Sequence, residues 1–236
     1  MKKLKRVLLK LSGESLKGEH EMYEKESIYN YADQVIQLAK QGIEIGVVIG
    51  AGNIWRGKLA GTLELNKIDA DFMGMFGTIM NTIAFAGVLR KRGYDKVKVY
   101  SALEIKTLTS PYNYIQAREE LKNGYIVLFA GGTGYSHFTT DTAAAIRAIE
   151  IGADAILMGK NGVKGVYDAD PKTNPNAKFF SHLTHTELVD KNLQVMDSTA
   201  ASTCRDAKMT IVVFDINAKN NIVNVINNKT EMTIIE

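Results

Sequence analysis

Residues 125–149, YIVLFAGGTGYSHFTTDTAAAIRAI, decide the fold of this chain. The stretch opens with the apolar run 126–129, which is typical of a buried parallel strand. Gly131, Gly132 and Gly134 follow directly, and glycine allows both a sharp turn and a close approach of the backbone to a ligand. This part of the sequence therefore predicts a strand that ends in a glycine-rich turn.

The residues after the turn predict the start of a helix. Thr139, Thr140 and Asp141 are favourable at a helix N-terminus, and we expect the helix itself over residues 143–149. Free backbone N–H groups and the positive end of the helix dipole would then face the turn, which makes an anion site. The alternative is a tight connection that binds nothing, but three glycines and the additional hydroxyl of Thr133 exceed the needs of a turn.

The rest of the chain repeats this alternation of strands and helices. The strands are continuous apolar runs, which indicates an α/β fold with a mainly parallel sheet covered by helices on both faces. Residues 159–177 are the longest polar stretch and the only plausible long loop. We expect strands over residues 6–11, 43–49, 97–100, 126–129, 155–158, 211–214 and 232–235, and helices over 27–41, 69–91, 114–122, 143–149, 184–191, 199–208 and 218–227.

Three expected strands end in glycine-rich turns, at residues 12–13, 50–52 and 131–134. Ligands of parallel α/β sheets bind outside the carboxyl ends of the strands. If these three strands are neighbours, one cleft receives all three turns.

Composition and charge exclude several classes of protein. Of the 236 residues, 45% are hydrophobic and 23% are charged, which is ordinary for a folded soluble chain. The net charge of +3 is small and evenly spread, so it favours anionic small molecules weakly and does not argue for nucleic acid. The single cysteine, Cys204, excludes an internal disulfide and suits a reducing cytoplasm, and we expect it to be buried.

No membrane segment is expected. Residues 1–15 have a charged start, but Lys10 interrupts the apolar run that a signal peptide needs. No stretch approaches the roughly 20 apolar residues of a membrane span. Within residues 69–91, we interpret the apolar side chains as core or as a subunit contact rather than as a cofactor site: Met73, Met75, Phe76, Ile79, Met80 and Ile83.

Two common nucleotide-binding signatures fit poorly. The Rossmann pattern begins at Gly50, but Trp55 stands where its third glycine belongs. Residues 52–58 nearly form a P-loop, although Leu59 replaces the hydroxyl residue that would hold magnesium. Gly61 and Thr62 also argue against a helix after that loop. A P-loop kinase remains an alternative.

Three charged residues are candidates for phosphate chemistry. Lys10 lies inside an apolar strand, where a lysine is costly unless it reaches solvent or meets an anion. It would meet a phosphate beside the N–H groups of Ser12 and Gly13. Arg56 has the same ambiguity and suits bidentate phosphate binding. Asp141 either complements the helix N-terminus or positions lysines or magnesium.

Five segments together resemble the bacterial uridylate kinases of the amino-acid-kinase family. They are KRVLLKLSGESL, GVVIGAGNIWRG, DADFMGMFGTIMN, FAGGTGYSHFTTDTAAAIRAIEIGAD and NGVKGVYDADP, in the family's order. The resemblance implies one domain over residues 1–236, a three-layer α/β/α sandwich that binds UMP in its amino-terminal half and ATP in the other. It also implies phosphoryl transfer from MgATP to UMP, giving UDP and ADP for pyrimidine nucleotide synthesis.

The resemblance assigns site residues position by position. Lys10, Leu11, Ser12, Gly13, Gly52 and Arg56 match contacts to the ATP phosphates, and Asn161, Tyr167 and Asp170 match the ATP base and ribose pocket. The UMP contacts would be Ala51, Asp71, Thr133, Gly134, Tyr135, Ser136, His137, Phe138, Thr139 and Thr140. Lys10, Arg56, Asp141 and Lys160 would act in catalysis, and no protein ligand to Mg²⁺ is expected.

The resemblance also implies a cytoplasmic homohexamer built from dimers and feedback inhibition by UTP. Two departures stand out. Ala51 occupies a position where many members have glycine, and residues 17–27 lack the glycine-rich stretch of members activated by GTP.

Two rival interpretations stay open. An aspartate, glutamate or carbamate kinase of the same family would need basic residues in the 133–140 loop, which has only His137. A non-catalytic nucleotide sensor on the same fold would be expected to lack Lys10 or Asp141, and both are present.

Overall fold

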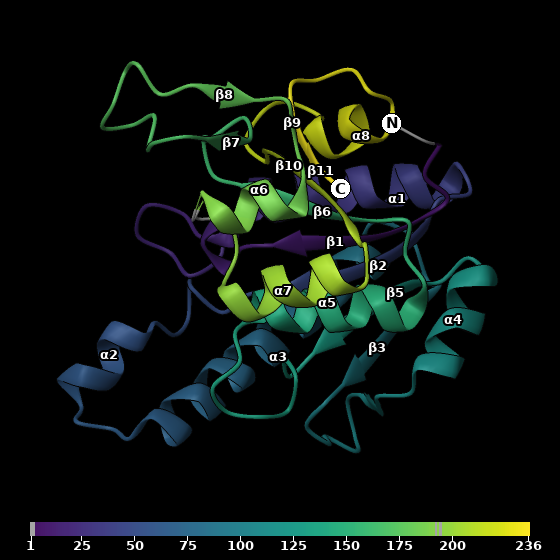
Figure 1. Ribbon diagram of the computed structural model, residues 1–236. Coiled ribbons are helices and arrows are strands. Elements are labelled where there is room, and N and C mark those ends of the chain that lie inside the picture. The colour runs from purple at the N-terminus through teal and green to yellow at the C-terminus, as the bar shows by residue number, and fades with distance from the viewer. Residues whose placement is uncertain (1–2, 192, 194) are drawn as a thin grey trace.

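The computed structural model describes residues 3–191, 193 and 195–236, and one nine-stranded sheet runs through it (Figure 1). The strand order is β4-β3-β5-β2-β1-β6-β10-β11-β9, and every neighbouring pair is parallel except β10–β11. The predicted mainly parallel α/β fold is confirmed. The strands are β1 (Arg6–Leu11), β2 (Glu44–Ile49), β3 (Val97–Ser101), β4 (Ser110–Pro111), β5 (Ile126–Ala130), β6 (Ala155–Lys160), β9 (His182–Leu183), β10 (Thr210–Asp215) and β11 (Thr233–Ile235).

Helices cover both faces of this sheet, and each face has its own apolar core. On one face lie α1 (Lys25–Lys40), α3 (Lys67–Lys91) and α8 (Asn221–Ile226). On the other face lie α4 (Tyr114–Lys122), α5 (Thr140–Ile151), α6 (His185–Asp190) and α7 (Ser198–Asp206). A short 3₁₀ helix, η1 (Gly13–Leu16), follows β1 directly.

The alternation of side chains along β1 decides where its lysine points. Val7, Leu9 and Leu11 belong to the α1–α3 core, whereas Leu8 belongs to the α5–α7 core. Because successive side chains of a strand point to opposite faces, Lys10 shares the face of Leu8 and is directed toward α5.

Two local predictions were wrong. A helix does follow residue 56: α2 (Gly57–Thr62), which buries Ala60 and packs against α3. This tertiary contact outweighs the poor helix propensity of Gly61 and Thr62. The polar stretch 159–177 is also not a single loop, since β6 extends to Lys160 and β7 (Val166–Tyr167) pairs antiparallel with β8 (Phe179–Phe180).

Helix α3 is longer and more apolar than the sequence interpretation allowed. By length and composition it could cross a membrane, so the expectation that no stretch approaches such a span was wrong. Half of its most apolar window is buried, and the helix packs on β3 and β5 as a core helix does. Met75 and Ile79 are buried as expected, whereas Met73, Phe76 and Met80 lie on an exposed apolar face.

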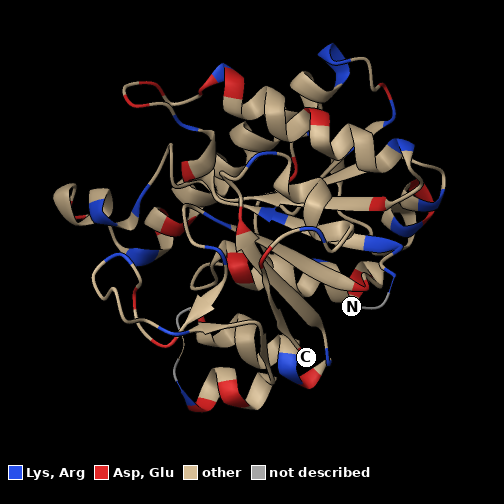
Figure 2. Ribbon diagram, turned by 90° about the horizontal axis from the view of Figure 1, so that it is seen from above, with Lys and Arg blue, Asp and Glu red and all other residues tan. Residues whose placement is uncertain are grey.

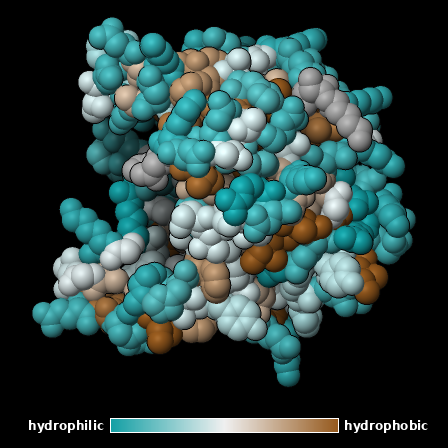
Figure 3. All heavy atoms as spheres, in the orientation of Figure 1, coloured by the Kyte–Doolittle hydropathy of each residue, from teal (hydrophilic) through white to brown (hydrophobic). Residues whose placement is uncertain are grey.

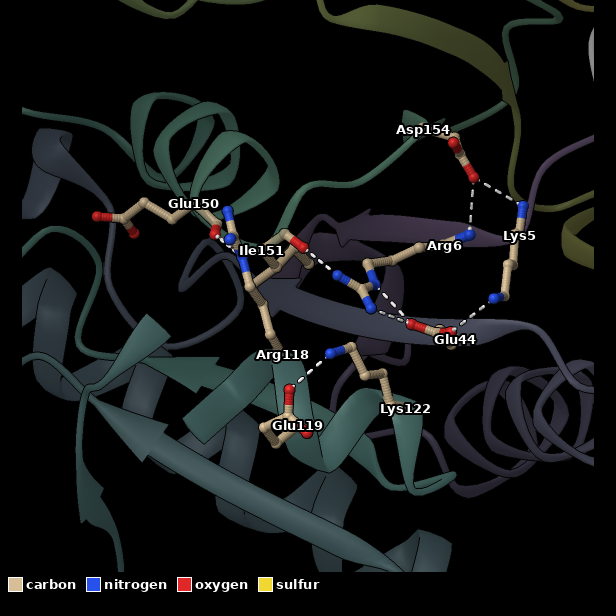
Figure 4. Close-up of polar contacts among 9 residues, drawn as sticks. All are labelled: Lys5, Arg6, Glu44, Arg118, Glu119, Lys122, Glu150, Ile151 and Asp154. Atoms are coloured by element: carbon tan, nitrogen blue, oxygen red, sulfur yellow. Dashed lines mark hydrogen bonds and ion pairs between the residues drawn. The ribbon is translucent and has the colours of Figure 1, made fainter. Parts of the chain in front are cut away.

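The amino-terminal edge of the sheet is occupied by structural ion pairs (Figure 4). Arg6 pairs with Glu44, and its backbone N–H donates to Asp154 Oδ2 at 2.9 Å. Elsewhere on the surface, basic and acidic residues are interspersed (Figure 2).

We predict that Cys204 is unreactive in the folded protein. It is fully buried, and this burial raises the pKa of its thiol to about 12. Because the thiolate is the reactive form, modification by DTNB at pH 8 should be roughly a hundredfold or more slower in the native protein than in denaturant. Rapid modification of the native protein would contradict the buried position.

Candidate active site

Three glycine-rich turns meet at the carboxyl edge of the sheet. The strands that carry them, β5, β2 and β1, are direct neighbours, and β6 follows next. A single cleft can receive all three turns only if these three strands are neighbours, and they are. In the orientation of Figure 1 these strand ends face left, and the surface is hollowed there, between the β7–β8 hairpin and α2 (Figure 3).

Gly13 holds the first turn against the second. A Cβ atom at this position would lie 2.5 Å from both Asn53 Oδ1 and Gly50 O, and 2.6 Å from Gly52 N. No side chain fits in that space. The backbones of the two turns are therefore in direct contact.

A buried amide pair fixes the second turn. Asn81 of α3 is fully buried, and its Nδ2 donates to Gly50 O and to Asn53 Oδ1, each at 2.7 Å. Asn53 Nδ2 donates back to Asn81 Oδ1 at 3.1 Å. Ala51 does not have a positive φ angle, so alanine fits the place where relatives were expected to have glycine. Sequence reasoning missed Asn81, although a polar residue inside an apolar helix was a usable signal.

Lys10 of β1 forms an ion pair with Asp141, which lies in the first turn of α5. Lys10 Nζ lies 2.8 Å from Asp141 Oδ1, and both side chains are largely buried, with 13% and 19% of their surface exposed. The hydroxyl of Thr139 accepts a hydrogen bond from the Asp141 backbone N–H at 3.0 Å and so caps α5. The β1 lysine thus stands at the N-terminus of the central helix.

Lys160, the last residue of β6, is a second ammonium group in the same place. Its amine donates to the Val195 carbonyl. Burial lowers the pKa of Lys160, and the positive charge of Lys10 lowers it further, while Asp141 opposes both effects. Lys160 and Lys10 therefore lie close enough for their charges to interact, and Asp141 attracts both.

A pocket of about 560 Å³, here called the β6 pocket, opens on the Lys160 side. Asn161, Tyr167 and Asp170 all line it, as do Lys160, Val166 and Lys191. The Oδ1 atom of Asn161 is buried without a hydrogen-bond partner among the described residues. This unused acceptor suits a ligand that donates a hydrogen bond.

A second pocket of about 680 Å³, the α3 pocket, lies between α3 and the 131–140 loop. Six of the eight candidate loop residues line it, whereas Gly134 and Ser136 do not. Gly132 of the glycine-rich turn lines it too. It also contains residues that sequence reasoning did not select as site residues: Trp55, Gly57, Ala60, Leu65, Lys67, Ala70, Gly74, Met75 and Thr78.

Asp71 supplies the carboxylate of the α3 pocket. Its Oδ2 accepts a hydrogen bond from the His137 backbone N–H at 2.7 Å, and its Oδ1 is paired with Lys67. Burial raises the pKa of Asp71, but Lys67 and the His137 N–H lower it by more, so the pKa falls below its usual value. The group is therefore an ionised acceptor at neutral pH.

The 131–140 loop has an unusual backbone that neighbouring elements hold in place. Gly131, Gly132 and Gly134 all have positive φ angles, and so does His137. The Gly131 N–H donates to Thr78 Oγ1 at 3.0 Å, and Arg147 donates to Gly132 O at 3.3 Å. The loop therefore has a defined shape before any ligand enters.

Arg56 has a half-exposed side chain and lies in the chain between Trp55 and Gly57, which both line the α3 pocket. Its Nε donates to Gly52 O at 3.0 Å, and its guanidinium pairs with Glu14 of η1. Glu14 was not among the candidate residues. Leu11 contributes only its backbone here, because its side chain lies in the core and its carbonyl accepts from Gly50 N–H at 2.9 Å.

This donor set is suited to phosphate oxygens. It offers two lysines, one arginine, a helix N-terminus and close backbone turns, all of which stabilise negative charge. Among the described residues, no group of three or more His, Cys, Asp or Glu is placed to hold a metal ion. The carboxylate nearest the two lysines, Asp141, pairs with Lys10.

Comparison with known proteins gives a consistent result. The amino acid kinase family matches residues 5–215. The chain is 56% identical over 230 residues to a uridylate kinase of Mesoplasma florum, covering 98% of this chain and 97% of that protein. It is 56% identical over 234 residues to a uridylate kinase of Mycoplasma capricolum, covering 99% of each. The crystal structure of a UMP kinase from Ureaplasma parvum superposes with a TM-score of 0.93 at 38% identity, covering 98% of both chains.

Proposed function

Since the chain belongs to the amino acid kinase family, we propose that it transfers the γ-phosphoryl group of ATP to UMP and releases UDP and ADP. The observation that supports this most directly is the Lys10–Asp141 pair at the seam between two nucleotide-sized pockets.

On the donor side, the β6 pocket holds ATP. Asn161, Tyr167 and Asp170 contact its base and ribose from the wall of that pocket. The phosphates extend toward the Ser12–Gly13 turn, where Lys10 and the backbone N–H groups bind them. This direction follows from Lys160, which lines the β6 pocket and is close enough to Lys10 for their charges to interact.

On the acceptor side, the α3 pocket holds UMP, with its phosphate toward Gly52. Asp71 accepts hydrogen bonds from the ribose, and the backbone of Ala51 borders the phosphate. Thr133 to Thr140 wrap the uracil end, and Tyr135, His137 and Phe138 are exposed at the rim of the pocket.

Transfer requires the two phosphates in line and the charge on the moving group stabilised. Arg56 bridges the UMP phosphate and the transferring group, and the α5 N-terminus adds a fixed dipole. Asp141 orients Lys10 and Lys160. The attacking phosphate oxygen is already ionised at pH 7, so no general base is needed.

Magnesium enters with ATP in this proposal. When bound, it would neutralise negative charge on the phosphate oxygens. The residues at the seam fit this arrangement, because they present cations and N–H groups to the phosphates and no carboxylate cage. We assign no protein ligand.

A parallel assay tests the function. ADP release should be measured with UMP, CMP, aspartate and carbamate, and we expect turnover with UMP alone. Trp55 is the only tryptophan and lines the α3 pocket, so its emission reports UMP binding independently of turnover. Turnover with aspartate or carbamate, or binding without any turnover, would favour one of the rival functions.

We predict that Asp71→Asn weakens UMP binding. The variant loses the charged acceptor, and hydrogen bonds to charged groups contribute about 1.5–3 kcal/mol, so KM for UMP should rise roughly 10- to 100-fold. The value of kcat should change less. Asp69→Asn is the matched control, since Asp69 lies on the same helix, does not line the α3 pocket and forms its hydrogen bonds with Asn66 at the start of the helix. An unchanged KM for UMP in Asp71→Asn would remove Asp71 from the site.

We further propose that the protein is cytoplasmic and assembles as a homohexamer, each subunit being a single domain. We also propose that UTP inhibits its kinase activity. The exposed apolar face around α2 and α3 supports a subunit contact; it comprises Leu59, Leu63, Leu65, Ile68, Met73, Phe76 and Met80. Sedimentation of the purified chain tests the assembly, and titration of the kinase assay with UTP tests the inhibition.

A further inference from the structure

A carboxylate stands in a cleft that is otherwise built for polyanions. Glu14 lies on η1, one residue after the Ser12–Gly13 turn, and its side chain is 35% exposed. A negative charge there repels phosphate oxygens unless its own partners neutralise it. The side chain therefore needs an explanation that ligand binding does not provide.

The contacts of Glu14 explain why a carboxylate lies in this cleft. One carboxylate oxygen pairs with the Arg56 guanidinium, and the other lies 3.7 Å from Lys17 Nζ. The carboxylate also lies against the second turn, since a Cβ atom on Gly52 would be 3.3 Å from Glu14 Oε1. Glu14 thus connects the first turn to the second.

The position of Glu14 is itself fixed by the first turn. Its backbone N–H donates to Ser12 Oγ at 3.3 Å, and the Ser15 N–H donates to Ser12 O at 3.1 Å. The position of the Glu14 carboxylate therefore depends on the first turn, and the position of the Arg56 guanidinium depends on that carboxylate.

Two of the five N–H donors of Arg56 are used in this arrangement, one by Gly52 O and one by Glu14. The remaining donors are available to phosphate oxygens. A long, half-exposed arginine otherwise loses considerable rotamer freedom when it is ordered. Fixing the guanidinium before substrates bind removes that cost from the reaction.

We infer that Glu14 is a positioning residue that holds the Arg56 guanidinium across the seam between the two nucleotides. The inference rests on the proposed function, because it assigns Arg56 to the transferring phosphate. Glu14 does not touch substrate, and its effect on turnover passes through Arg56.

A double-mutant cycle of Glu14→Ala and Arg56→Ala tests this dependence. Glu14→Ala alone should lower kcat roughly 10- to 100-fold, as expected for a misplaced group, while KM for ATP stays within about threefold. In the Arg56→Ala background, the same change should have little further effect. Glu14→Gln keeps an acceptor oxygen and should recover most of the loss.

Glu19→Gln is the matched control, since Glu19 is nearby in the chain and 89% exposed. Its kcat should equal that of the wild type. Equal losses from Glu14→Ala in both backgrounds would overturn the inference, as would a higher kcat in Glu14→Ala, which would mean that Glu14 withholds Arg56 from substrate. Absence of UMP turnover in the wild type would instead reject the proposed function.

Discussion

Replacing Lys10 with alanine should lower kcat about 10²- to 10³-fold, which is the usual cost of removing one group that stabilises transition-state charge. Lys10 lies at the seam, paired with Asp141 at 2.8 Å and largely buried. Its removal leaves Asp141 without its direct partner, and only Lys160 then offsets that negative charge near the phosphates, so the loss exceeds that of a missing hydrogen bond. Steady-state kinetics with varied ATP and UMP, together with a thermal melt, measure the effect.

Two companion variants sharpen this result. Lys40→Ala removes an exposed lysine at the end of α1 and should leave kcat unchanged. Asp141→Asn should cost less than Lys10→Ala, because Asp141 orients the lysines and does not contact phosphate. Near-normal turnover and unchanged ATP affinity in Lys10→Ala would show that the lysine has no part in transfer.

Gly13→Ala should impair both stability and turnover. Its Cβ atom would overlap three atoms of the second turn, two of which belong to the backbone, so residues 50–53 must move. Such overpacking costs typically 1–3 kcal/mol, which lowers Tm by roughly 2–12 °C in a chain of this size. Displacing Arg56 and the phosphate turns by about 1 Å should lower kcat about 10²-fold.

Gly87→Ala is the control for this substitution. A Cβ atom on Gly87 meets nothing within 4 Å, and its position inside α3 favours alanine by up to about 1 kcal/mol. Its Tm should be equal or higher. If Gly13→Ala retained the wild-type Tm and kcat, the two turns would not be packed as tightly as the structure indicates.

Local sequence signals were sufficient for most of the fold. Apolar runs such as residues 126–129 and 155–158 became central strands, because buried parallel strands must be apolar on both faces. Gly42, Gly93 and Gly124 follow helices with positive φ angles, as helix-ending glycines do. The conflict posed by a lysine inside an apolar strand also pointed correctly to Lys10 as a residue with a buried anionic partner.

Local signals failed where a tertiary contact outweighed them. Helix α2 forms over two poor helix residues because Ala60 packs on α3, and β7 exists because β8 pairs with it. Secondary-structure propensity depends on a few consecutive residues, so it cannot reveal a packing contact or a strand partner that is distant in the sequence.

By itself, the sequence determined the alternation of strands and helices and the glycine-rich turns that end three strands, and it singled out Lys10 as a strand lysine that needs an anionic partner. Only the tertiary structure decided that β5, β2 and β1 are neighbours, that Asn81 fixes the second turn and that Glu14 holds Arg56. The physical reason is that a period of apolar residues encodes which face of an element is buried, whereas the partner across that face is selected by the packing of the whole chain.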